Sequence, residues 1–175
     1  MVGLLTRIGG FLRNSSGIWT PNSGVSSVGT NGLVGFNDYV TSTPGNTGYI
    51  YACPSVTPTS SGTVRYAHFY GKLAGPEAAY FFLWDSDGAI LLCATITVGD
   101  VDAWYTADSG SSVVISTGSI YSIGFYAVQH NTAYRSASAG SYKYASGTMT
   151  CPGSSLPALS DWYTNPIALY WDNTP

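Results

Sequence analysis

The chain has 175 residues, a length that fits one sandwich or barrel domain and is short for two well-buried domains. Hydrophobic residues make up 45% of it and charged residues only 9%, against about 25% charged residues in an average soluble domain. The formal net charge is −3 and the six basic residues are scattered, so we expect no nucleic-acid partner. No apolar run approaches about 18 residues, so we expect no membrane-spanning segment and no membrane partner.

The first 13 residues differ in pattern from the rest of the chain. Their apolar residues recur at spacings of one, three and four, which predicts one apolar face of a short helix. Gly9 and Gly10 each weaken an isolated helix by about 1 kcal/mol, so we expect this segment to order only against something else. It could cap its own core or anchor the chain in a groove of a neighbouring subunit. The candidate anchor residues are Leu4, Leu5, Ile8, Phe11 and Leu12.

Residues 14–48 are rich in Gly, Ser, Asn and Thr, which are turn and loop residues. Clean alternation of apolar and polar residues is missing, and only residues 33–36 indicate a short strand. We therefore expect residues 1–48 to form an N-terminal anchor segment and an irregular arm. Residues 49–175 should form the folded domain.

From residue 49 onward the pattern is that of β-strands, rich in Val, Ile, Tyr, Phe and Thr and punctuated by Gly, Pro, Asp and Ser. The clearest hairpin joins residues 81–84 to 89–92 through Asp-Ser-Asp-Gly at residues 85–88. Several short strands without a long helix predict an all-β fold, an antiparallel β-sandwich of jelly-roll type. Predicted strands cover residues 49–53, 64–73, 79–84, 89–98, 103–107, 112–117, 120–128, 142–149 and 167–172, with Phe81, Leu83 and Phe125 as candidate core residues.

Motifs for nucleophilic catalysis, phosphate binding, zinc hydrolysis and dinucleotide binding are missing from the sequence. His68, expected on a strand face with Val64, Tyr66 and Tyr70, and His130, expected in a loop, are more typical of structural or surface residues. Glu77 is the only glutamate, whereas a glycosidase normally needs two facing carboxylates. We therefore expect no catalytic residues and no enzyme activity, although the fold could still bring a carboxylate pair or a Ser/His pair together.

Two further groups of residues are candidates for binding metal ions. Asp85 and Asp87 could hold Ca²⁺, but the same residues are typical of a tight hairpin loop. Cys93 lies in an apolar run and predicts a buried thiol, while Cys53 and Cys151 each precede a proline and could pair. Three isolated cysteines do not supply a zinc ligand set, so we expect no metal and no cofactor.

Aromatic residues are abundant, with 14 Tyr, 5 Trp and 6 Phe. Exposed Tyr and Trp provide a large contact area at low entropic cost, and their rings can stack on sugar faces. The alternative for each ring is packing within the sandwich or at a subunit interface. The possible surface-recognition aromatics are Trp104, Tyr105, Tyr134, Trp162 and Tyr163.

Residues 79–128 carry a Leu-Trp-Asp-x-x-Gly hairpin, then a loop with Trp, then a Gly-x-x-Tyr-x-(Ile/Val)-x-(Phe/Tyr)-Tyr-Ala strand. In this pattern the chain resembles bacterial and phage β-sandwich domains. The charge-poor lead-in is also similar in style to tailed-phage virion proteins, which implies a homotrimeric structure on a capsid or tail fibre. The matching positions are Leu83, Trp84, Asp85, Gly88, Trp104, Gly118, Tyr121, Phe125, Tyr126 and Ala127.

The leading expectation is a structural protein of the phage virion surface, a capsid decoration (cement) protein that forms a homotrimer. Residues 1–20 would bind the major capsid protein or another virion protein, and many symmetric copies would add avidity. The alternatives are a tail-fibre or receptor-binding head that recognises a host surface glycan through loop Tyr and Trp, and a secreted carbohydrate-binding module unrelated to phage.

Overall fold

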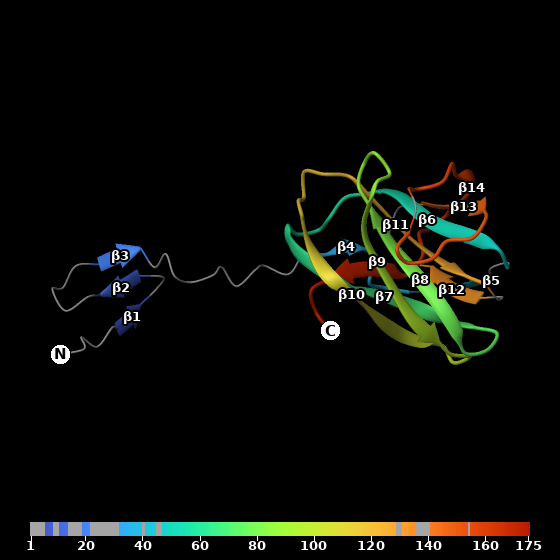
Figure 1. Cartoon of the computed structure of the whole chain (residues 1–175), viewed down its shortest axis with the longest axis horizontal. Helices are drawn as coiled ribbons and strands as arrows, with labels where there is room; N and C mark the ends of the chain where they lie inside the picture. Colours follow the sequence, from blue (N-terminus) through green and yellow to red (C-terminus); the bar gives the residue numbers. More distant parts are fainter. Residues whose placement is uncertain are drawn as a thin grey trace. The chain divides into compact units, whose positions relative to one another are not determined.

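The structure is a computed structural model of the chain (Figure 1). It describes residues 6–8, 11–13, 19–21, 32–39, 41–44, 47–128, 131–135, 141–153 and 155–175. For residues 6–21, 41–44, 131–135 and 161–164 this description covers strands and not side chains. The contacts divide the chain into two compact units, Met1–Thr30 and Asn31–Pro175, which are considered separately below.

The first unit contains a three-stranded antiparallel sheet and not the predicted helix. Ile8 pairs with Phe11 across the first two strands. The prediction was wrong because two short strands joined by Gly9 and Gly10, a dipeptide that favours tight hairpins, also place apolar residues at spacings of three and four. The strands are β1 (Thr6–Ile8), β2 (Phe11–Arg13) and β3 (Trp19–Pro21).

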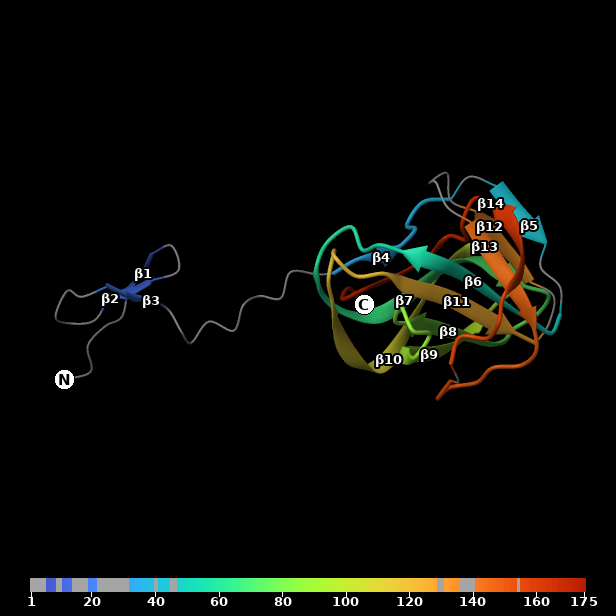
Figure 2. The ribbon, with the colours of Figure 1, turned by 90° about the horizontal axis from the view of Figure 1, so that it is seen from above.

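The second unit is a sandwich of two antiparallel sheets packed face to face (Figures 1 and 2). No helix occurs among the described residues, and so none there is long and apolar enough to cross a membrane. The first sheet has the order β4-β15-β7-β12-β5, with β10 on the other edge of β7, and the second has the order β14-β13-β6-β11-β8-β9. The prediction of an all-β sandwich is confirmed.

The first sheet consists of β4 (Val34–Gly35), β5 (Thr41–Pro44), β7 (Gly62–Leu73), β10 (Ala103–Ile115), β12 (Asn131–Arg135) and β15 (Leu169–Asp172). The second consists of β6 (Tyr49–Val56), β8 (Glu77–Trp84), β9 (Ile90–Val98), β11 (Tyr121–Ala127), β13 (Ser141–Ser146) and β14 (Ser160–Thr164).

The predicted strands match this set closely, with two kinds of difference. Residues 103–107 and 112–117 were expected as two strands but belong mainly to the single strand β10, whose pairing with β7 is irregular between Asp108 and Val113. Strands β5, β12 and β14 were not predicted because they are short and lack alternating apolar residues. Since β4 and β5 pair within the first sheet, the sandwich begins before the expected boundary at residue 49.

The main core lies between the two sheets and follows the period of two in each strand. Phe69 of β7 contacts Phe125 of β11 with ring centroids 4.9 Å apart, and Phe81 of β8 packs beside both. Phe81, Leu83 and Phe125 are fully buried, which confirms them as core residues.

A second apolar cluster covers the outer face of the second sheet. The alternate strand residues Phe82 and Trp84 of β8 and Tyr126 of β11 point away from the main core, yet each is at most 2% exposed. Residues 147–153 and 155–159, which we call the strap, cover them with apolar side chains that include Met149 and Leu156. The Leu156 amide donates a 2.8 Å hydrogen bond to the Gly88 carbonyl. The sandwich therefore has a third, partial layer.

A disulfide between Cys93 of β9 and Cys151 of the strap fixes this layer to the edge of the sheet, with 5.7 Å between the Cα atoms. Cys53 is the free cysteine and lies in the main core. The prediction of a Cys93 thiol was wrong, and the possible Cys53–Cys151 pair does not form, because Cys53 lies in the main core whereas Cys93 lies at the sheet edge, against the strap. Burial raises the pKa of the Cys53 thiol to about 12, although the Ile167 amide donates a hydrogen bond to its sulfur.

Replacing both Cys93 and Cys151 by serine should lower the free energy of unfolding by about 2–4 kcal/mol, because the disulfide closes a long loop. Urea unfolding followed by tryptophan fluorescence measures this change. A thiol reductant should bring the wild-type protein to the stability of the variant and leave the variant unchanged. Equal unfolding midpoints for oxidised wild type and variant would contradict a stabilising role of the disulfide.

Candidate functional site

Aromatic side chains gather on the outer surface of the first sheet. Trp104 of β10 pairs with Tyr70 of β7, and Tyr170 of β15 pairs with His68 of β7. Directly paired residues of antiparallel strands share one face, so the three strands bring these rings together. Tyr39, which follows β4, stacks on Tyr70. We call these five residues, Tyr39, His68, Tyr70, Trp104 and Tyr170, the aromatic face.

The rings of the aromatic face form a continuous set of contacts. The centroids of Tyr39 and Tyr70 are 3.7 Å apart with an interplanar angle of 7°. Trp104 meets Tyr70 at 5.3 Å and Tyr170 at 5.5 Å, edge to face in both cases. His68 stacks on Tyr170 at 4.5 Å. Such a network holds each ring in one orientation.

Two rings of the aromatic face remain accessible to solvent. Tyr39 is 44% exposed and Trp104 is 38% exposed, which makes them two of the most exposed aromatic residues among the described side chains. Their centroids lie 6.1 Å apart with an interplanar angle of 67°, so the two rings form a corner. Tyr70 and Tyr170 are half-buried below them, and burial raises the pKa of Tyr170.

His68 lies at the base of the aromatic face and joins three strands. Its Nδ1 lies 3.0 Å from the Thr106 hydroxyl on β10, and its Nε2 lies 2.9 Å from Asp172 Oδ1 on β15. These are the residue types of a nucleophile, base and acid set. However, only 8% of the His68 side chain is exposed and Tyr170 stacks on the ring, so this arrangement suits the connection of strands better than access to a substrate.

The prediction that His68 shares a face with Tyr66 and Tyr70 agrees with the register, whereas Val64 does not belong to that face. Val64 is fully buried in the main core. The alternation of β7 changes phase between Val64 and Ala67, beside the irregular part of β10. The sequence prediction assumed a uniform period of two along the strand, and therefore placed Val64 on the wrong face.

Charged side chains border the aromatic face in pairs of opposite sign. Arg65 makes two 2.7 Å hydrogen bonds to the two carboxylate oxygens of Asp108. Lys72 Nζ lies 3.1 Å from Asp102 Oδ2. The Arg65 guanidinium and the Gly110 amide lower the pKa of Asp108 to about 2.

The predicted surface-recognition aromatics are distributed over both sides of the sandwich. Trp104 lies on the aromatic face, whereas its neighbour Tyr105 packs against the main core and its hydroxyl donates to the Val101 carbonyl at 2.8 Å. The structure places Tyr134 on β12 and both Trp162 and Tyr163 on β14, and their side chains lie outside the description.

The candidate anchor residues all belong to the first unit. Ile8 belongs to β1, and Phe11 and Leu12 belong to β2, with only their strand positions described. Leu4 and Leu5 lie outside the described residues. Their role as an anchor stays a prediction.

Sequence reasoning missed three rings of the aromatic face, Tyr39, Tyr70 and Tyr170. The alternation Tyr66-x-His68-x-Tyr70 in one strand was a usable signal, because it places several rings on one side of β7. Tyr39 gave no such signal, since it lies outside any strand and reaches Tyr70 only through the fold.

Asp85 and Asp87, the acidic pair that could hold Ca²⁺, belong to the tight hairpin loop of residues 85–88. Asp85 Oδ1 accepts hydrogen bonds from the amides of Asp87 and Ala89 at 3.0 and 2.8 Å, and Gly88 has a φ of +79°. These contacts confirm the predicted tight hairpin. The described residues contain no group of three or more His, Cys, Asp or Glu side chains that could hold a metal ion.

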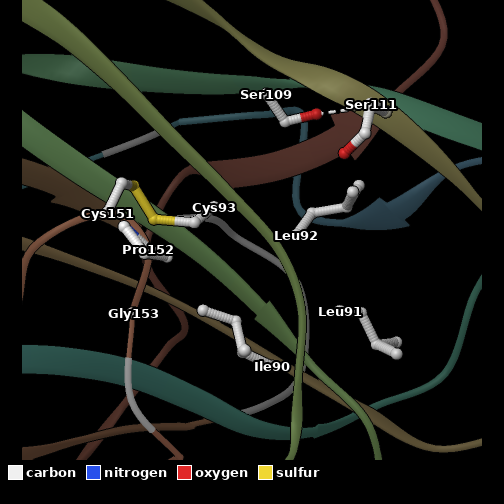
Figure 3. Close-up of a pocket in the computed structure, with 9 residues that line it drawn as sticks. All are labelled: Ile90, Leu91, Leu92, Cys93, Ser109, Ser111, Cys151, Pro152 and Gly153. Atoms are coloured by element: carbon white, nitrogen blue, oxygen red, sulfur yellow. Dashed lines mark hydrogen bonds between the residues drawn. A yellow bond between two sulfur atoms is a disulfide. The ribbon is translucent and has the colours of Figure 1, made fainter.

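An open hollow of about 430 Å³ lies on another part of the surface, beside the Cys93–Cys151 disulfide (Figure 3). It is lined by residues 90–93 and 151–153 together with Ser109 and Ser111. The Ser109 hydroxyl lies 2.6 Å from the Ser111 carbonyl and 2.8 Å from the Arg65 carbonyl, so local backbone groups engage it. The lining offers no charged side chain, and we regard the aromatic face as the better candidate site.

Comparisons with known proteins found no match among family models, curated proteins or solved structures. The resemblance to phage β-sandwich domains therefore stays a prediction. Function has to be inferred from the site and not from the fold.

Replacing Asp108 by asparagine should lower the thermal unfolding midpoint above pH 4 and leave it unchanged near pH 2. Because the folded-state pKa of Asp108 lies near 2, below the ordinary aspartate value of 3.8, the stabilisation is present above about pH 4 and is lost as the pH falls through 2. The pair is exposed, so the difference should be small. Arg65→Gln should give the same pH profile in thermal melts. A difference that persists below pH 2 would assign the effect to another cause.

Proposed function

We propose that this protein is a non-catalytic recognition head that binds glycans through the aromatic face. The observation that carries this proposal is the corner of Tyr39 and Trp104, two accessible rings held by the half-buried rings of Tyr70 and Tyr170. One face of a pyranose ring presents C–H groups, which pack well against the electron-rich face of an aromatic ring. Because other rings already hold Tyr39 and Trp104 in place, binding would cost little side-chain entropy.

The acidic residues near the aromatic face support a binding role over glycoside hydrolysis. Asp102 and Asp108 stand six positions apart along one strand direction, which corresponds to roughly 20 Å. Asp172 lies opposite the same β7 residue as Asp108, Tyr66, but its side chain is only 14% exposed and accepts hydrogen bonds from His68 and the Thr174 amide. A glycosidase places its two carboxyl groups about 5–9.5 Å apart across the scissile bond. Asp102 and Asp108 are also engaged with cations, Lys72 and Arg65 respectively.

We also infer that the sandwich is a jelly roll. The support comes from the strand order β5-β12-β7-β10 in one sheet and β6-β11-β8-β9 in the other. Between β5 and β12 the chain changes sheet at every connection except the hairpin from β8 to β9. This order corresponds to two interlocked Greek keys of four strands each.

The first test is glycan binding by wild type and by Trp104→Ala. On a glycan array, wild type should bind a defined set of glycans, and Trp104→Ala should lose at least about tenfold in affinity, since it removes a central stacking ring. Val114→Ala is a matched control, because Val114 is 74% exposed and lies outside the aromatic face. A wild-type protein that binds no glycan would contradict the proposed function.

A second candidate function, capsid decoration, is favoured by the separate first unit. Three strands of three residues each cannot bury a core of their own, so Met1–Thr30 would gain stability by packing on another protein. In this proposal the first unit attaches a homotrimer to the major capsid protein or another virion protein. The same attachment would also serve a tail-fibre head.

Deletion of residues 1–30 separates attachment from recognition. Purified capsids or tails should bind the full chain, and the chain that begins at residue 31 should lose this binding while it keeps the thermal stability of the sandwich. Co-sedimentation measures the binding and thermal melting serves as the control. Equal sedimentation of both chains would overturn the role of the first unit in attachment.

A further inference from the structure

We infer that the aromatic face selects neutral pyranosides and discriminates against sugars that carry carboxylate or sulfate groups. This inference rests on the proposed glycan-binding function and adds the chemical class of the ligand. The evidence for this selectivity is that the charged side chains bordering the aromatic face form ion pairs with one another.

Both cations that border the face are already bound to carboxylates. The Arg65 guanidinium is paired with Asp108 through two hydrogen bonds, the strongest common geometry of an arginine–carboxylate pair. Lys72 is paired with Asp102. An acidic sugar would have to displace one of these aspartates before it could gain a salt bridge.

Among the side chains that the structure describes near the aromatic face, the carboxylates also outnumber the permanent cations. Asp102, Asp108 and Asp172 stand on or next to β10 and β15, against Arg65 and Lys72 on β7. Asp172 accepts from His68 and from the Thr174 amide, and the whole chain carries a net charge of −3. The local potential is therefore negative, which disfavours the approach of an anion within the screening length of about 8 Å at physiological salt.

A neutral sugar finds complementary groups at the same place. Trp104 offers the stacking surface, and the Lys72–Asp102 pair lies two positions further along both strands. Lys72 and Asp102 are 38% and 30% exposed, so an ammonium donor and a carboxylate acceptor are within reach of hydroxyl groups.

The experiment uses matched pairs of neutral and acidic glycans, such as lactose against sialyllactose and cellobiose against its glucuronate counterpart. Immobilised pairs on one array and calorimetry in solution should show at least about tenfold tighter binding of the neutral member by the full wild-type chain. Trp104→Ala should lose binding of both members.

Asp102→Asn tests the role of charge pairing directly, because it leaves Lys72 without its carboxylate. The acidic-to-neutral affinity ratio should rise several-fold in this variant. Asp108→Asn is the matched control and should change the ratio less, because Asp108 lies four positions from Trp104, on the other side, whereas Asp102 lies two positions from it. An unchanged affinity ratio in Asp102→Asn, or a wild-type preference for acidic glycans, would overturn the proposed selectivity. In either case, glycan binding that is lost in Trp104→Ala would still support the proposed function. Absence of any glycan binding would overturn both.

Discussion

Strand β7 pairs with three other strands along its length, and this pairing positions most of the molecule. One edge of β7 binds β10, while the other edge binds β15 in its central part and β12 at its C-terminal end. The period of two then gives the strand two different roles. Phe69 points into the main core, whereas His68 and Tyr70 point outward and form the base of the aromatic face. Core and site are thus two sides of the same strand.

The second sheet carries large apolar side chains on its outer face as well as on its core face. Alternation places Phe82 and Trp84 on the side away from the main core, where they would be exposed to water without a cover. The strap buries them, and the Cys93–Cys151 disulfide fixes the strap to the sheet edge. Gly124 of the central strand β11 leaves room for Trp84, since a Cβ atom there would lie 2.9 Å from the indole ring. Cover, disulfide and glycine together make a sheet with two apolar faces stable in water.

The low charge of the chain also has a structural consequence. With 9% charged residues, few ions are available for the surface, and those that border the aromatic face are used in pairs. The proposed site therefore consists of rings and ion pairs, and the cations described at its border, Arg65 and Lys72, are both paired. Such a surface matches an uncharged polar ligand better than a phosphate or a sulfate. The first unit adds a second, independent candidate for contact with a larger assembly.

The sequence by itself determined the all-β class, most strand positions, the core residues Phe81 and Phe125 and the hairpin at residues 85–88, because these follow from local alternation and turn chemistry. It misled at the N-terminus, where residues 6–8 and 11–13 form strands and not the predicted helix. Among the aromatic candidates only Trp104 was placed on the site. The tertiary structure decided the Cys93–Cys151 pair and the contact of Tyr39 with Tyr70. Both contacts depend on which strands become neighbours. That arrangement results from packing two sheets over one core, and local sequence patterns do not show which distant segments will meet.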